Sequence, residues 1–307
     1  MPLPYRWQRR FERWKNSLAG FFGFSEQQPR PKLCPACGSL VGISATRCHE
    51  CGASLRFSIA ALSKSLSEII GVETSLSSIL LVANILMFGV SYLITLKEGG
   101  GGGLNILWGM SGMGSYQLGA SHPYPFFYEH QWWRLFTAMF LHGGLIHLGM
   151  NMASLLQLAP ALEELYGSGR FLFIYVFTGA FGYLVSVFTG HFSLGASGAL
   201  LGLVGAMLAI TTKRGGAFMQ SLRNQLLSSV SFIVILGFWG SFRIDNYAHI
   251  GGLAAGFALG KLFADREPMN SKERNRAYAL GWIAGLAVVA SFVLMIIHFN
   301  DPTPFSQ

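Results

Sequence analysis

Seven strongly apolar stretches alternate with polar segments along the chain. Each is close to the roughly 20 residues that an α-helix needs to cross about 30 Å of hydrocarbon. They lie near 76–96, 145–162, 171–189, 197–212, 226–240, 248–264 and 279–298. The pattern predicts an all-α polytopic membrane protein with seven spans, of which 197–212 and 226–240 are short and rich in Gly or Ser.

The polar segment between the first two spans, 97–131, is long for a connection. It opens on five glycines and then becomes rich in Tyr, Trp, Phe and Pro. Aromatic side chains favour the boundary between membrane and water, and long connections in compact proteins are commonly functional. We therefore expect this segment to insert into the interface beside the outer leaflet rather than to cross the membrane.

Composition and charge narrow the class further. The chain is 51% hydrophobic and only 12% charged, below the ~25% charge of a soluble domain. The net charge is +8, and the basic residues indicate the orientation in the membrane. All 22 Lys and Arg residues except Lys97, Arg134 and Arg243 fall on the same side of the membrane as the N-terminus. We expect a bacterial plasma (inner) membrane protein with a cytoplasmic N-terminus, an external C-terminus and no nucleic-acid partner.

The residues before the first span divide by composition into a basic leader (1–30), a cysteine module (31–55) and a linker (56–74). In the leader, aromatic residues recur at helical spacing among arginines. This pattern fits either a helix lying on anionic lipid or an unstructured basic segment.

The cysteine module contains two CxxC knuckles, and the four cysteines of the chain are Cys34, Cys37, Cys48 and Cys51. Two such knuckles at this spacing predict a zinc-ribbon-like module in which four thiolates hold one structural zinc ion. The alternatives are a redox pair or two disulfides. Both are disfavoured because the segment is expected on the cytoplasmic side, where thiols are kept reduced. Four protein ligands leave no open position for catalysis, so we expect a structural metal and a possible cytoplasmic partner for the module.

Polar residues inside apolar spans are costly and therefore indicate function. Ser197 and His249 each begin a span at the outer face, so they lie at comparable depth. Glycines recur at nearly every fourth residue on both spans, which lets the two helices approach closely. We therefore predict Ser197 as a nucleophile and His249 as its general base.

A third polar group lies in the second span. His147 and Asn151 are four residues apart, so they share one helix face. Their side-chain N–H groups could form an oxyanion site together with the Ser197 amide, whereas the alternative is a purely structural role in hydrogen bonding between helices. Asp245, four residues before His249, reads either as a third member of a triad or as a helix cap. Arg134 reads as structural.

The motifs, in this order, resemble those of the rhomboid intramembrane serine proteases. The matching pieces are Leu118-Gly-Ala120, Gln131-Trp-Trp-Arg-Leu-Phe-Thr137, His142 with His147 and Asn151, Glu164 with Gly167, Gly195-Ala-Ser-Gly198 and Ala248-His-Ile-Gly-Gly252. The resemblance covers about 75–262. It departs from the family at Leu201, where an aromatic residue often packs on the catalytic histidine.

The resemblance implies a rhomboid-like six-helix core with a Ser197/His249 dyad, no cofactor for catalysis, and a seventh helix that follows the core. Its substrates would be transmembrane segments of other proteins in the bilayer, cut near their outer ends. A catalytically inactive, rhomboid-like binding or quality-control protein is the alternative. The expected parts are a protease core (75–264), a cytoplasmic loop (265–278), a seventh transmembrane helix (279–298) and an external tail (299–307).

Overall fold

The computed structural model describes residues 32–33, 40–41, 75–99, 103–238, 244–263 and 265–301. The chain divides into two compact units, Met1–Ser78 and Ile79–Gln307. In the first unit, β1 (Lys32–Leu33) pairs antiparallel with β2 (Leu40–Val41), with Lys32 opposite Val41. The four cysteines, the leader and the linker lie outside the described residues.

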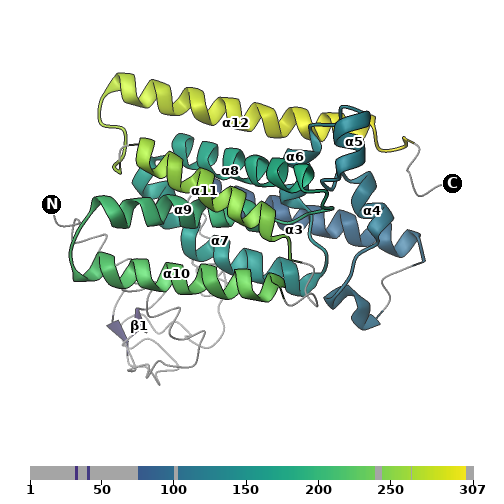
Figure 1. The fold of residues 1–307 in the computed structure, drawn as a ribbon, viewed down its shortest axis with the longest axis horizontal. Coiled ribbons are helices and arrows are strands. Elements are labelled where there is room, and N and C mark those ends of the chain that lie inside the picture. Colours follow the sequence, from purple (N-terminus) through teal and green to yellow (C-terminus); the bar gives the residue numbers. More distant parts are fainter. Residues whose placement is uncertain are drawn as a thin grey trace. The chain divides into compact units, whose positions relative to one another are not determined.

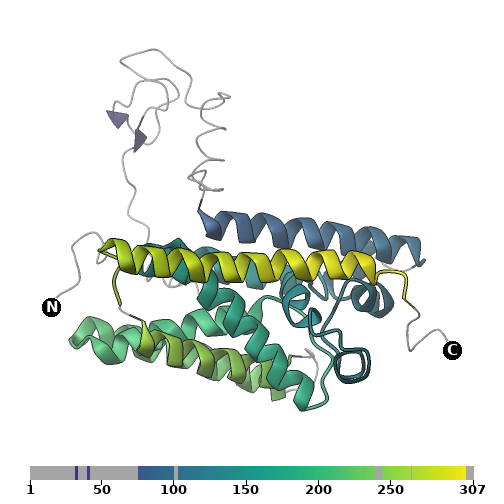
Figure 2. The same ribbon diagram turned by 90° about the horizontal axis from the view of Figure 1, so that it is seen from above.

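Helices make up the described part of the second unit (Figures 1 and 2). The long ones are α3 (Leu76–Lys97), α7 (Leu145–Tyr166), α8 (Ser168–Phe188), α9 (Ser197–Lys213), α10 (Ala217–Phe238), α11 (Asn246–Leu262) and α12 (Ser271–Ile297). Short elements lie between α3 and α7, namely η1 (Gly103–Leu107), α4 (Gly112–Gln117), α5 (Pro123–Tyr128), α6 (Arg134–Thr137) and η2 (Ala138–Phe140). The prediction that the described part of 97–131 contains no spanning helix is therefore confirmed.

Each of the seven predicted spans coincides with a helix, but not every helix is a full span. Among the described residues, five helices are long and apolar enough to cross a membrane: α3, α7, α8, α10 and α12. The helices α9 and α11 have 17 residues each, which at 1.5 Å per residue reach about 26 Å of the roughly 30 Å needed. The sequence predicts spans at these two helices as well, which carry Ser197 and His249, and both are shorter than the other five.

Two helices begin earlier than the apolar pattern predicts. The helix α10 starts at Ala217 instead of 226, and α12 starts at Ser271 instead of 279. Charged and amide side chains interrupt the apolar pattern in the added turns, so hydropathy alone does not detect them. At the start of α12, the Asn270 side chain accepts a hydrogen bond from the Glu273 amide at 2.8 Å, which is a local capping signal.

The helix α9 is the centre of the unit. Every residue from Gly198 to Thr211 is buried, and α9 packs against α11, α8, α7 and α10. In Figure 1, α8, α11 and α9 lie between α12 and α10. This packing encloses the short helix that begins at Ser197 and leaves the apolar outer faces of α3, α10 and α12 exposed.

Candidate active site

Ser197 and His249 meet across the first turns of α9 and α11. The distance from His249 Nε2 to Ser197 Oγ is 2.7 Å. His249 is buried and Ser197 is partly buried. With a neutral imidazole that carries its proton on Nδ1, Nε2 accepts the hydrogen bond that the serine hydroxyl donates.

Glycines bring the two helices together at this point. A Cβ added at Gly252 would overlap the carbonyl oxygen of Gly198, and one at Gly256 would overlap that of Gly202. Backbone therefore packs on backbone at both positions, as the glycine pattern predicts. This close approach places the side chains at the helix starts within hydrogen-bonding distance.

The start of α11 is held by Asp245. One carboxylate oxygen accepts hydrogen bonds from the amides of Tyr247 and Ala248 at 3.0 and 3.1 Å, and the other accepts one from the Ser186 hydroxyl of α8. Among the described residues, no partner hydrogen-bonds to His249 Nδ1. Asp245 is therefore a helix cap, and the reading as a third triad member is not realised in this geometry.

His147 and Asn151 lie beside the segment that leads into α9. Gly195 has φ +125°, and a Cβ there would lie 2.8 Å from His147 Nε2 and 3.9 Å from Asn151 Nδ2. His147 Nδ1 accepts a hydrogen bond from the Gly143 amide at 3.3 Å, which leaves the proton on Nε2. Asn151 Nδ2 donates one of its two hydrogens to the His147 carbonyl at 3.0 Å, and the second hydrogen is available for another acceptor. Two side-chain donors thus adjoin the segment that carries Ser197.

The backbone before Ser197 is held from several directions. The Gly195 amide donates to the Ala138 carbonyl at 2.9 Å, and the Tyr183 hydroxyl donates to the Gly195 carbonyl. Ser193 and Ser121 exchange two backbone hydrogen bonds of 3.0 Å each, which ties this segment to the loop before α5. The free amides at the start of α9 therefore have a defined direction, as an oxyanion site requires.

Arg134 holds the connection between α3 and α7 together, as the structural reading expects. Its guanidinium donates to the Gln131 side chain and to the Tyr116 carbonyl, both at 2.6 Å, and to the Ala120 carbonyl at 3.3 Å. It also lies over the Tyr116 ring at 4.3 Å from the centroid. Burial lowers the pKa of Arg134 to about 10, so the group stays charged at neutral pH.

His142 is close to the other polar groups but does not join their hydrogen bonds. It is buried, and its ring lies 5.1 Å from that of His147. Within the described part of the chain, no group of three or more His, Cys, Asp or Glu residues is arranged to hold a metal ion.

Sequence reasoning missed two residues of this site. Tyr183 and Ser186 lie in the apolar helix α8 and contact the Gly195 carbonyl and the Asp245 carboxylate. Only the polarity of these side chains within a span could have drawn attention to them. Nothing in their spacing indicates which partners they meet.

Comparison with known proteins agrees with these features. A family model described as the Rhomboid domain matches residues 129–266. The chain is 42% identical over 129 residues to the rhomboid protease GluP of Bacillus subtilis (strain 168), covering 41% of this chain and 25% of GluP. It is 35% identical over 140 residues to YdcA of the same strain, covering 45% of this chain and 70% of YdcA. It is 33% identical over 194 residues to RHOMBOID-like protein 6, mitochondrial, of Arabidopsis thaliana. That match covers 55% of this chain and 61% of the relative, so the chain spans a quarter of GluP and about three-fifths of the plant protein.

Proposed function

The chain belongs to the rhomboid family, and from this membership we propose that it is an intramembrane serine endopeptidase in which Ser197 and His249 form the catalytic dyad. The observation that carries the proposal is the 2.7 Å hydrogen bond between His249 Nε2 and Ser197 Oγ. Ser197 and His249 lie on separate helices, α9 and α11, whose backbones are in close contact. A serine hydroxyl is a weak nucleophile unless an adjacent base takes its proton, and this contact supplies that base.

The proposed mechanism has two halves. In the first, His249 Nε2 takes the hydroxyl proton as Ser197 Oγ attacks the scissile carbonyl, and the oxyanion is stabilised by the Ser197 amide with His147 and Asn151. The imidazolium then gives the proton to the leaving amine, and an acyl-enzyme remains. In the second half, His249 takes a proton from water, the hydroxide attacks the ester, and Ser197 regains its proton. No cofactor takes part.

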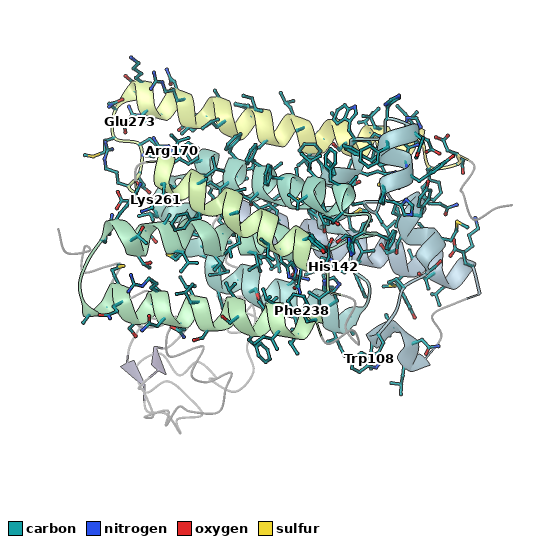
Figure 3. The ribbon with its side chains drawn as sticks, viewed as in Figure 1. Trp108, His142, Arg170, Phe238, Lys261 and Glu273 are labelled. Atoms are coloured by element: carbon teal, nitrogen blue, oxygen red, sulfur yellow. The ribbon has the colours of Figure 1, made fainter. Side chains whose placement is uncertain are left out.

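The proposed substrates are transmembrane segments of other proteins, cut near their outer ends. The supporting observation is that Ser197 begins α9 and Lys213 ends it, so the nucleophile lies at the opposite end from a basic cluster. Figure 3 shows Lys261 and Arg170 at the same end of the helices, together with Glu273, and His142 well away from them. Because basic residues favour the cytoplasmic side, the active site faces outward. A substrate helix has to unwind to expose a peptide bond, so helix-destabilising residues near the cut favour cleavage.

The decisive experiment compares wild-type protein with Ser197→Ala and His249→Ala. Wild-type protein should cleave a reporter transmembrane segment and react with a fluorophosphonate, and both variants should lose both activities while remaining folded. Cleavage by Ser197→Ala would refute the assignment. Folded wild-type protein that neither cleaves nor reacts would favour the inactive family member.

We also propose that the four cysteines bind one structural zinc ion. The chemistry of the donors supports this, since four thiolates in two CxxC knuckles suit tetrahedral zinc. In sequence, Cys34 and Cys37 fall between the paired strands β1 and β2. Metal analysis of the purified full chain should find about one zinc per chain, and Cys34→Ser should lower that content. The module's cytoplasmic partner stays a prediction.

The domain boundaries and the six-plus-one arrangement, with α12 as the seventh transmembrane helix, belong to the same proposal. The bacterial plasma membrane remains a prediction, because relatives of similar identity come from Bacillus subtilis and Arabidopsis thaliana alike. The chain is an integral membrane protein whichever of these sources it comes from, because five helices within the described residues are long and apolar enough to cross a membrane.

A further inference from the structure

The helix α12 has one buried face that continues to its outer end. The buried residues of α12 are Ala277, Ala284, Ser291 and Met295. They recur in steps of seven and four, so they lie on one face. At the other end of the helix, Gly281 approaches Gly169 of α8 so closely that an added Cβ would lie 2.9 Å from the Gly169 Cα. This contact packs α12 closely against α8 near the start of the helix.

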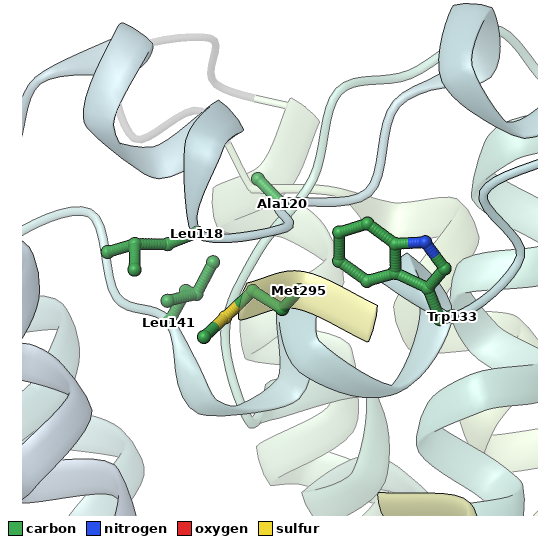
Figure 4. Close-up of a cluster of buried hydrophobic side chains, with 5 residues drawn as sticks. All are labelled: Leu118, Ala120, Trp133, Leu141 and Met295. Carbon is green, nitrogen blue, oxygen red and sulfur yellow. The ribbon is translucent and has the colours of Figure 1, made fainter. Parts of the chain in front are cut away.

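Met295 is part of a buried cluster formed by three separate parts of the chain (Figure 4). The cluster, here called the Met295 cluster, consists of Leu118, Ala120, Trp133, Leu141 and Met295. In Figure 4, Met295 lies between Leu141 and Trp133. Phe292 of α12 is partly buried against the same cluster. His298, one turn further along, stacks on the Trp133 ring at 5.9 Å between centroids.

The Met295 cluster borders the segment that carries the nucleophile. Leu194, three residues before Ser197, packs against it. Ala120 belongs to the cluster and precedes Ser121, which is bonded to Ser193. The Met295 cluster therefore contacts Leu194 directly and is linked to Ser193 through Ser121.

A second contact reaches the same segment through η2. The Phe140 ring meets the Phe292 ring at 5.3 Å between centroids. Two residues before Phe140, the Ala138 carbonyl accepts the hydrogen bond of the Gly195 amide. The outer half of α12 thus supports the backbone before Ser197 by two routes that share no hydrogen bond.

We propose that Met295 and Phe292 are positioning residues for the nucleophile, so that α12 holds the segment 193–195 in its reactive geometry. The inference rests on the proposed dyad for its catalytic consequence. Removing the Met295 side chain leaves a void that neighbouring groups fill only in part, so the cluster shifts. Such a shift moves Leu194 and with it the direction of Ser197 Oγ and of the free amides at the start of α9.

The test compares Met295→Ala with Ile296→Ala, a matched control that removes a similar number of atoms. Ile296 is 68% exposed, whereas Met295 is 7% exposed. Met295→Ala should lower kcat and the rate of fluorophosphonate labelling about tenfold with little change in KM, because small misplacements of reacting groups are costly. Met295→Leu should restore most of the rate, and Ile296→Ala should match wild type. Phe292→Ala is the second variant if Met295→Ala does not fold.

Amide hydrogen exchange of a peptide covering 193–197 provides a readout that needs no activity. Exchange there should quicken about tenfold in Met295→Ala and stay unchanged in Ile296→Ala, as expected for local loosening. Unchanged exchange, or equal effects of both variants, would overturn the inference. If wild-type protein does not react with the fluorophosphonate but exchange still quickens, the proposed function fails and the structural support by α12 stands.

Discussion

The contact between Gly252 and Gly198 is the place where a single methyl group should separate the dyad. In Gly252→Ala, the new Cβ would overlap the Gly198 carbonyl oxygen, which is backbone and cannot rotate away. The added Cβ would lie 2.1 Å from that oxygen, so the helices have to part by about 1.3 Å to restore an ordinary contact of 3.4 Å. Gly252 is one helical turn from His249, so most of this displacement reaches the imidazole. The 2.7 Å bond to Ser197 Oγ would then lengthen beyond 3.5 Å.

Loss of that hydrogen bond should slow the reaction strongly, because general base catalysis contributes about 10²- to 10⁴-fold. We expect fluorophosphonate labelling of purified Gly252→Ala to be at least about 100-fold slower than that of wild type. The matched control is Gly89→Ala in α3, where an added Cβ meets nothing within 4 Å, so its rate should equal wild type. Gel filtration and thermal unfolding show whether each variant is folded. A folded Gly252→Ala that labels at the wild-type rate would refute the reasoning.

Substitutions at three further residues test the contacts that support the site. Asp245→Ala removes the cap of α11 and the partner of Ser186. It should lower the free energy of unfolding by about 1 kcal/mol, measured by thermal unfolding, and slow fluorophosphonate labelling. Asp245→Asn should retain most of the stability and most of the labelling rate. Tyr183→Phe leaves the buried Gly195 carbonyl without its donor, which should cost about 1–3 kcal/mol. A Tm equal to wild type would contradict that contact. Arg134→Lys loses the planar arrangement of donors and should destabilise the protein by about 2 kcal/mol, a change that a denaturant titration in mixed micelles measures.

Hydropathy predicts where helices occur in this protein better than where they begin. It places a helix at each of seven apolar stretches because bilayer thickness requires long apolar runs. It does not detect the first turns of α10 and α12, because charged and amide side chains interrupt the apolar pattern there. It also does not show that α9, a helix of 17 residues, is enclosed by other helices.

The candidate site divides in the same way. Ser197 and His249 could be selected from sequence because each is a polar residue at the start of an apolar stretch with glycines on one face. Asp245 could be read in two ways, and only the positions of the Tyr247 and Ala248 amides decide for the cap. Met295 is one apolar residue among many in α12, and its burial depends on Trp133 and Leu141, which are distant in sequence.

The sequence by itself determined the membrane class, the number and order of the long helices, and the residue types available for chemistry, because these depend on local composition and spacing. The tertiary structure decided which helix starts face one another, which way the Asp245 carboxylate points, and that Tyr183, Ser186 and Met295 support the site. Most of these contacts join segments that are far apart in the chain. A periodicity along one helix indicates that a face is buried but does not identify the residues that cover it.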